Sequence, residues 1–180
     1  MTSPIESQNP TNAPDDARFA DVSQISPPSL FVRVIGSGFF TGYIPIASGT
    51  IGSFVGLLFF LIPGFAESSV HLPAIGVMFL IGLRAANAME KSYGRDPSVV
   101  TIDEIVGMWI SLAFLPKTIF VITTAFFLFR FFDIVKPYPA RRFDEMSGGF
   151  GIMMDDVIAG IYANVVIQLL ISIPFVKQLI

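Results

Sequence analysis

The chain has 180 residues, of which 53% are hydrophobic and only 14% are charged, and its formal net charge is −3. A soluble domain carries about 25% charged residues, so this composition favours lipid as the surrounding medium and offers no basic surface for nucleic acid. The sequence has no cysteine and a single histidine, His71. It therefore excludes disulfides, thiolate metal sites and a cysteine nucleophile, and any histidine chemistry would have to use that one residue.

The first 29 residues are polar and rich in proline, serine and asparagine. We expect them to form a mobile tail, because they lack the basic start and apolar run of a signal peptide. Residues 30–180 are expected to form one all-α domain embedded in the membrane. Largely uncharged runs predict its helices at 34–66, 68–83, 105–129 and 157–176. In the first run, the part from residue 49 is nearly as long as a membrane span, which needs about 20 residues. Its Gly-rich first half is expected to be interfacial or partly inserted.

The third run is interrupted by Pro116 and Lys117, so it forms either one span or two short helices. Basic residues flank it on both sides, namely Arg84, Lys91 and Arg95 before it and Arg130, Lys136, Arg141 and Arg142 after it. The positive-inside rule places both flanks in the cytoplasm, and only a helical hairpin permits that. We therefore predict a multi-pass membrane bundle of about five helical segments with acidic cytoplasmic loops, roughly at 84–104 and 130–156.

Acidic residues outside the tail concentrate in these two loops, as Asp103, Glu104, Asp133, Asp144, Glu145, Asp155 and Asp156. Some have an ordinary structural interpretation, because Thr101 with Glu104 fits a capping box and Asp155 could cap the last helix. Asp133 does not, since it lies near a helix C-terminus, where the helix dipole disfavours an acid. Either Lys136 neutralises Asp133 or a metal ion shared with other carboxylates does.

Carboxylates from separate helix ends, together with water and substrate phosphate, are typical ligands of Mg²⁺. The acids therefore predict a Mg²⁺ site that faces a phosphate group. Lys136, Arg141 and Arg142 lie among these acids and could bind the phosphate. The two arginines could equally anchor the chain to lipid headgroups.

Glycine-rich segments lie close to these charges. Thr50 and Ser53 in the segment SGTIGS could present hydroxyls to an anion at a helix start. Gly52 and Gly56 of the same region also have the spacing that packs membrane helices. The segment SGGFG at 147–151 is typical of a turn that lets the backbone approach a ligand.

Taken in order, the segments GSGFFTGYIPIASGTIGS, TIDEIVGMW, FRFFDIVKPYPARRFDE and GGFGIMMDDVIAG resemble the phosphatidylglycerophosphatase A family, from about Gly36 to Ala163. The resemblance implies an all-helical enzyme of the bacterial inner membrane with its site facing the cytoplasm. It also implies Mg²⁺-dependent removal of the terminal phosphate from phosphatidylglycerophosphate, which leaves phosphatidylglycerol. The chain departs from the family at Ser48-Gly49-Thr50, where the usual motif is Pro-Gly-Thr and the proline would stiffen the turn.

The resemblance and the local chemistry together give the expected site. We expect the catalytic residues to be Asp103, Asp133, Asp155 and Lys136, the metal ligands to be Asp103, Glu104, Asp133, Asp155 and Asp156, and the substrate-binding residues to be Thr50, Ser53, Lys136 and Arg141. The glycerol end of the substrate is expected near Phe31, Phe39 and Phe40. Either a carboxylate activates water or an aspartate attacks phosphorus directly.

Two other functions stay open on the sequence. A Mg²⁺-dependent transferase acting on a lipid pyrophosphate or a CDP-activated lipid would also use aspartates at helix ends. Such enzymes usually repeat these aspartates on a single helix, and no such repeat is present here. A cation transporter would need acids at mid-depth in the membrane, whereas the acids here lie at the ends of the apolar runs.

Overall fold

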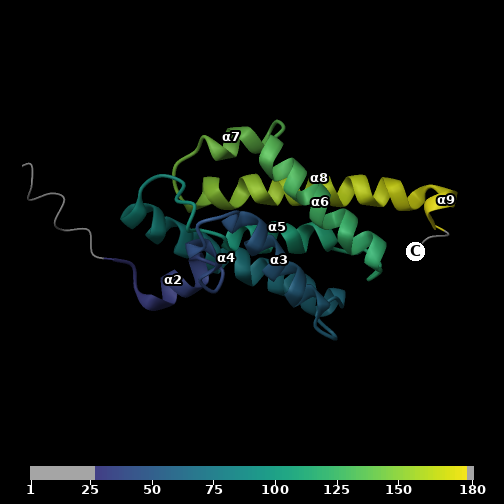
Figure 1. The fold of residues 1–180 in the computed structure, drawn as a ribbon, viewed down its shortest axis with the longest axis horizontal. Coiled ribbons are helices and arrows are strands. Elements are labelled where there is room, and N and C mark those ends of the chain that lie inside the picture. Colours follow the sequence, from purple (N-terminus) through teal and green to yellow (C-terminus); the bar gives the residue numbers. More distant parts are fainter. Residues whose placement is uncertain (1–26, 178–180) are drawn as a thin grey trace, which may run out of the picture.

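The computed structural model describes residues 27–177, so residues 1–26 of the predicted tail and residues 178–180 lie outside the described part. The described residues form helices and no strand, which confirms the all-α prediction (Figure 1). They are α2 (Leu30–Gly36), η2 (Thr41–Tyr43), α3 (Ser48–Leu61), α4 (Ser68–Tyr93), α5 (Ile102–Leu112), α6 (Ile119–Val135), α7 (Ala140–Asp144), α8 (Gly149–Ser172) and α9 (Pro174–Lys177).

Two of these helices, α4 and α8, are long and apolar enough to cross a membrane. They contain 26 and 24 residues, and each exceeds the roughly 20 residues that cross the hydrocarbon core. α8 is the central helix, because it packs against α4, α5, α6 and α7. The other helices of the described part are shorter, so the predicted bundle of about five membrane segments stays a prediction.

Both predicted loops are shorter than the charge pattern suggested, and this part of the prediction is wrong. α4 continues past Leu83 to Tyr93, because Ala85, Ala86 and Met89 remain buried while Arg84, Asn87 and Lys91 are exposed on its outer side. α6 likewise continues to Val135, and α8 already begins at Gly149. Charge ended the apolar runs but did not end the helices, since lysine, arginine and glutamate are good helix formers.

The predicted hairpin in the third run is confirmed. α5 ends at Leu112, and α6 begins after Thr118, whose side chain accepts a hydrogen bond from the Val121 N–H. Asn164 of α8 donates to the backbone oxygens of Ser111 and Ala113, at 3.1 and 2.8 Å. These bonds provide partners for carbonyl groups that a helix end leaves unpaired.

Small residues bring the helices of the core close together. A Cβ on Gly56 of α3 would lie 3.1 Å from the Ile105 backbone of α5, and one on Gly160 of α8 would lie 2.5 Å from the Gly107 oxygen. The Trp109 indole N–H also donates to the Gly56 oxygen at 2.8 Å. The packing interpretation of the Gly52–Gly56 spacing is therefore confirmed.

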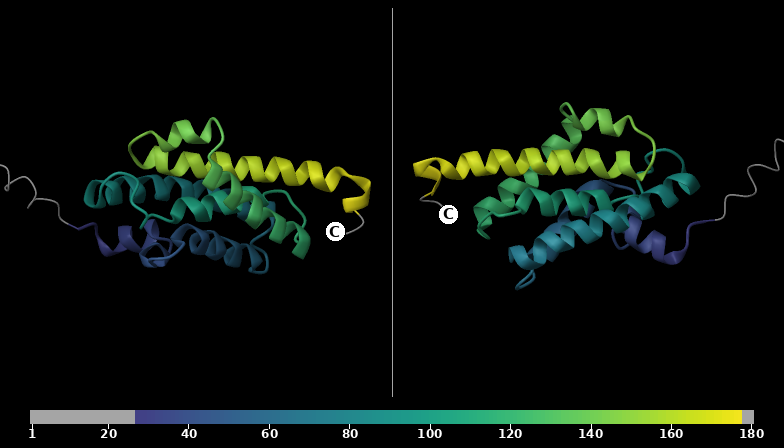
Figure 2. Two further views of the ribbon diagram at one scale, coloured as in Figure 1. Left: turned by 45° about the horizontal axis from the view of Figure 1, so that its top comes forward. Right: turned by 180° about the vertical axis from the view of Figure 1, so that it is seen from behind.

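The elements that carry charge gather at one end of the molecule. Figure 1 shows the end of α4, helix α7 and the start of α8 at that end, with α9 at the other. In Figure 2, α7 lies over the N-terminal half of α8 in both views. The two acidic segments of the sequence are therefore neighbours in space.

Candidate functional site

The acids of both segments line one hollow of about 230 Å³, which we call the acidic hollow. It is lined by Ser48, Gly49, Asp96, Pro97, Ser98, Val100, Asp103, Glu104, Arg130, Asp133, Lys136, Asp155 and Asp156. All five predicted metal ligands and Lys136 are thus brought together, from α5, α6, α8 and the connections beside them. Their individual roles stay a prediction.

Three carboxylates form the tightest group within the acidic hollow. Asp103 and Glu104 lie in the first turn of α5, and Asp156 lies on α8. One oxygen from each lies within 4.8 Å of the others. Each of the three also has a buried oxygen without a hydrogen-bond partner, namely Asp103 Oδ1, Glu104 Oε2 and Asp156 Oδ2. Buried carboxylates at this separation can all stay ionised only if a cation lies among them.

The donor set fits a hard divalent cation. Burial raises the pKa of Asp103 and raises that of Glu104 well above its usual range, to which the adjacent Asp103 charge contributes. These carboxylates are therefore costly to keep ionised without a positive partner. Carboxylate oxygens suit Mg²⁺, Ca²⁺ and Mn²⁺ and are poor ligands for soft metals. The structure supports an acidic metal-binding cluster and does not distinguish among the hard ions.

The capping explanations for these acids are wrong. Thr101 is the N-cap residue of α5, but its side chain makes no capping hydrogen bond; instead its Oγ1 pairs with Thr41 Oγ1 at 3.0 Å. α8 is capped by Gly148, which has φ of 96°, and Asp155 lies in the second turn. Glu104 and Asp155 are thus free of the structural role that the sequence alone would allow.

Asp133 and Asp155 are held by cations, unlike the group of three. Asp133 pairs with Arg130 at 2.7 Å, and Arg130 also donates to Ser53 at 3.3 Å. The alternative that Lys136 neutralises Asp133 is therefore wrong. Lys136 instead donates to Asp155 at 2.7 Å and to Asp144.

Lys136 remains a cation at the edge of the acidic hollow. Burial alone would lower its pKa, but the hydrogen bonds to Asp144 and Asp155 outweigh burial and raise it. It has a φ of 47° and caps the C-terminus of α6, so its backbone turns out of the helix. A fixed ammonium group thus lies beside three carboxylates that have no cation partner in the described residues, and such a group can bind phosphate.

The other predicted substrate-binding residues lie outside the lining of the acidic hollow. Ser53 is fully buried behind it, where its hydroxyl donates to the Gly49 oxygen at 2.8 Å. Thr50 is half-buried on α3 and does not line the acidic hollow. Arg141 lines a second hollow that shares Lys136 with the first. The roles of these residues in binding stay predictions.

Sequence reasoning missed two charged residues of the site, Arg130 and Asp96. Arg130 stands three residues before Asp133, which is the spacing of a helical ion pair, so the pattern contained its signal. Asp96 has a φ of 44° in the connection between α4 and α5. No signal in the sequence links Asp96 to the acids of α8, because the link depends on how that connection folds back.

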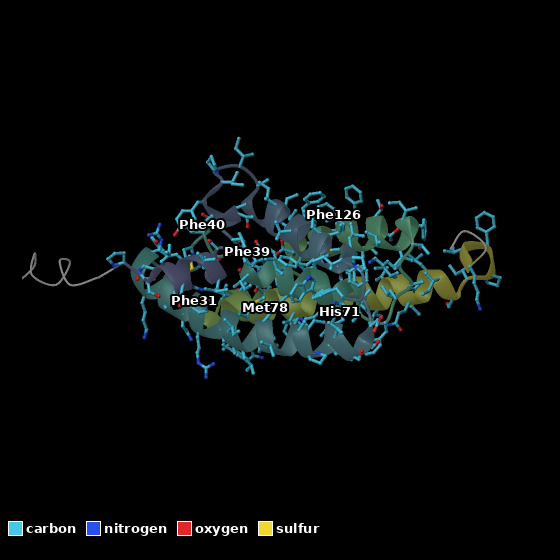
Figure 3. All side chains as sticks on the ribbon, turned by 90° about the horizontal axis from the view of Figure 1, so that it is seen from below. Phe31, Phe39, Phe40, His71, Met78 and Phe126 are labelled. Atoms are coloured by element: carbon cyan, nitrogen blue, oxygen red, sulfur yellow. The ribbon has the colours of Figure 1, made fainter. Side chains whose placement is uncertain are left out.

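The single histidine is not part of the acidic hollow. His71 is 2% exposed and packs between Phe60 and Phe65, with ring centroids 5.2 and 5.5 Å away. Figure 3 shows His71 well away from Phe39 and Phe40 along the length of the molecule. The charged side chains that line the acidic hollow are therefore carboxylates, one lysine and one arginine, without an imidazole.

Comparison with known proteins agrees with this chemistry. Residues 34–171 match the family described as phosphatidylglycerophosphatase A. Two proteins named phosphatidylglycerophosphatase A are similar. The one from Haemophilus influenzae is 39% identical, over 76% of this chain and 86% of its own length. The one from Escherichia coli is 33% identical, over 72% and 77%.

A third relative carries a different name. A protein from Bacteroides thetaiotaomicron, with the provisional name phosphatidylinositol-3-phosphatase, is 42% identical over 78% of this chain and 93% of its own length. The names of these relatives share the removal of a phosphate from a phospholipid. No solved structure matches the chain.

Proposed function

Because the chain belongs to the phosphatidylglycerophosphatase A family, we propose that it hydrolyses phosphatidylglycerophosphate to phosphatidylglycerol and inorganic phosphate in phospholipid biosynthesis, with Mg²⁺ as its cofactor. The observation that carries the proposal is the group of Asp103, Glu104 and Asp156, whose buried oxygens have no partners, beside the cation of Lys136. A phosphomonoester and a hard metal ion complement that combination of charges.

In this proposal Asp103, Glu104 and Asp156 hold Mg²⁺. When bound, the ion neutralises charge on the phosphate and orients water. Lys136 donates to a phosphate oxygen while Asp155 and Asp144 keep its ammonium group in position. The Asp133 carboxylate, held by Arg130 at 2.7 Å, lines the same hollow and is the catalytic carboxylate of this proposal.

We further propose that α4 and α8 cross the bacterial inner membrane within a multi-pass bundle. Their length and apolar composition support this placement. Arg95 lies in the connection after α4, Lys136 caps α6, and Arg141 and Arg142 lie on α7, all at the end of the molecule that holds the acidic hollow. By the positive-inside rule that end faces the cytoplasm. The lipid substrate then keeps its acyl chains in the bilayer while its headgroup reaches the acidic hollow.

A second candidate substrate is phosphatidylinositol 3-phosphate. The name of the Bacteroides thetaiotaomicron relative, at 42% identity, favours it. Both lipids carry a phosphomonoester on a polyol headgroup, so the same metal and lysine could serve either. Comparing the two substrates on one enzyme preparation decides between them.

The test is phosphate release by the purified chain in detergent. Wild type and Asp133→Asn are compared on both lipids, with Mg²⁺ and with EDTA. Glu67→Gln is the matched control, because Glu67 is an exposed acid before α4 whose side chain makes no capping bond. We expect wild type and Glu67→Gln to release phosphate only with Mg²⁺, and Asp133→Asn to be folded and inactive.

Other outcomes would replace this function. Release of pyrophosphate or CMP from an activated lipid would make the chain a transferase. Metal flux into liposomes without hydrolysis would make it a transporter. If Asp133→Asn kept full activity, the Asp133–Arg130 pair would be structural and the catalytic role of Asp133 would be wrong.

A further inference from the structure

The second hollow, on the other side of Lys136, has a composition opposite to the first. It has a volume of about 620 Å³ and is lined by Val135, Lys136, Pro137, Tyr138, Arg141, Arg142 and Glu145. We call it the basic hollow, because three of these residues are cations and one is an acid. Lys136 lines both hollows, so they are adjacent.

The two arginines of the basic hollow are available to a ligand. Arg142 is exposed, and its side chain has no ion-pair partner in the described part of the chain. Arg141 approaches Glu145 at 3.7 Å, with both side chains more than two-thirds exposed. An exposed pair at that distance contributes little. Both guanidinium groups can therefore bind an anion without breaking a strong contact.

An apolar strip continues from the basic hollow along α6. Phe127, Phe131 and Ile134 are 65%, 55% and 72% exposed. Their spacing of four and three residues places them on one face of the helix. Val135 and Tyr138, which line the basic hollow, are also exposed, at 55% and 74%. From the acidic hollow outward, the surface thus presents carboxylates, then Lys136, then Arg141 and Arg142. The exposed apolar face of α6 comes last.

This order matches the chemistry of one molecule. A phospholipid with a phosphorylated headgroup carries a terminal phosphomonoester, then an internal phosphodiester, then acyl chains. We propose that Arg141 and Arg142 bind the internal phosphodiester while the monoester occupies the acidic hollow and the acyl chains lie against the exposed face of α6. This inference rests on the proposed function, and it makes the internal phosphodiester the feature by which the enzyme selects its substrates.

The phosphodiester is also what the two candidate substrates share. Phosphatidylglycerophosphate and phosphatidylinositol 3-phosphate both carry a monoester separated from a diester by a polyol. Phosphatidic acid has one phosphate, attached directly to diacylglycerol, and cannot occupy both hollows. Recognition of two phosphates would let one site act on different headgroups, and it predicts that lipids with a single phosphate are poor substrates.

The test uses short-chain phosphatidylglycerophosphate in neutral detergent micelles. Wild type is compared with Arg142→Gln and with the double variant Arg141→Gln/Arg142→Gln. Lys91→Gln is the control, because Lys91 is an exposed cation in the last turn of α4 without an ion-pair partner in the described residues. We expect the single variant to raise KM about fivefold and the double variant about tenfold or more, with kcat nearly unchanged. Lys91→Gln should match wild type.

Two inhibitors separate the hollows. Phosphatidylglycerol, the product, keeps the diester and lacks the monoester, so its inhibition should weaken in the arginine variants. Inorganic phosphate should occupy the acidic hollow alone and inhibit all variants equally. Thermal stabilisation by short-chain phosphatidylglycerol gives the same comparison without turnover, and it should fall in the double variant.

Three results would overturn the inference. An unchanged KM would remove the arginines from substrate binding, and an equal loss of inhibition by inorganic phosphate would assign them to the terminal phosphate. An effect confined to anionic vesicles, absent in neutral micelles, would make them a bilayer anchor. If wild type released no phosphate at all, the proposed function would fail. The stabilisation by phosphatidylglycerol would still decide whether the diester site exists.

Discussion

Gly49 offers the sharpest test of the geometry of the site. It lies in the first turn of α3, where a Cβ would come within 3.0 Å of Glu104 Oε1 and stand 3.0 Å from Arg130 Nη2. Real Cβ atoms essentially never approach other atoms that closely. In Gly49→Ala the Glu104 carboxylate must therefore move by roughly 1 Å. The carboxylate ends a flexible side chain, so the fold should accommodate the methyl group.

A shift of that size at a metal ligand should reduce kcat by about 100-fold. We expect Gly49→Ala to unfold at nearly the wild-type temperature while phosphate release falls by that factor. Gly76→Ala is the matched control, because a Cβ there meets nothing within 4 Å and Gly76 also lies within a helix. It should keep full activity and gain about 0.5–1 kcal/mol of stability. Wild-type activity in Gly49→Ala would refute the close approach of α3 to Glu104.

Three further predictions concern the metal, the lysine and the core. Mg²⁺ at about 100 times its dissociation constant should stabilise wild type by about 2.7 kcal/mol in thermal unfolding, and Asp156→Asn should lose this stabilisation. Lys136→Met should abolish phosphate release, whereas Asp144→Asn should keep most of it, because the Lys136–Asp155 pair at 2.7 Å remains; equal losses would contradict this division. Asn164→Ala should lower stability by about 1–2 kcal/mol with unchanged kcat, since its two bonds to carbonyl groups at the C-terminal end of α5 lie outside the site.

The sequence predicted the helices well and their ends poorly. The apolar runs located α3, α4, α5, α6 and α8, and Pro116 with Lys117 located the hairpin. The predicted helix ends were wrong because a change in hydropathy marks where contact with lipid or the core stops. The helix itself stops only where hydrogen bonding stops. α4 therefore runs on to Tyr93 with polar residues on its outer side.

The sequence predicted most of the charged residues that make up the site but not which of them pair with one another. The acids and Lys136 could be selected because helix dipoles and capping did not account for Asp133, and the family motifs pointed to the same positions. The ion pairs among these residues could not be predicted, because they depend on the distances between side chains of different helices. Arg130 and Lys136 are both three residues from Asp133, but only Arg130 lies within α6 and so shares a helix face with Asp133. Lys136 has left that helix and turns toward α8.

Asp155 and Asp156 show why such pairing matters. Successive residues of a helix point about 100° apart. Asp155 therefore faces Lys136 at 2.7 Å, while Asp156 approaches Asp103 and Glu104. One turn of α8 thus supplies one carboxylate that holds Lys136 and another that joins the group of three carboxylates. A one-residue shift of α8 would put Met154 or Val157 in place of one of these two carboxylates. The contact between Gly160 and the Gly107 oxygen, where a Cβ would lie at 2.5 Å, opposes such a shift. The glycines of the core therefore set which acid meets which charge.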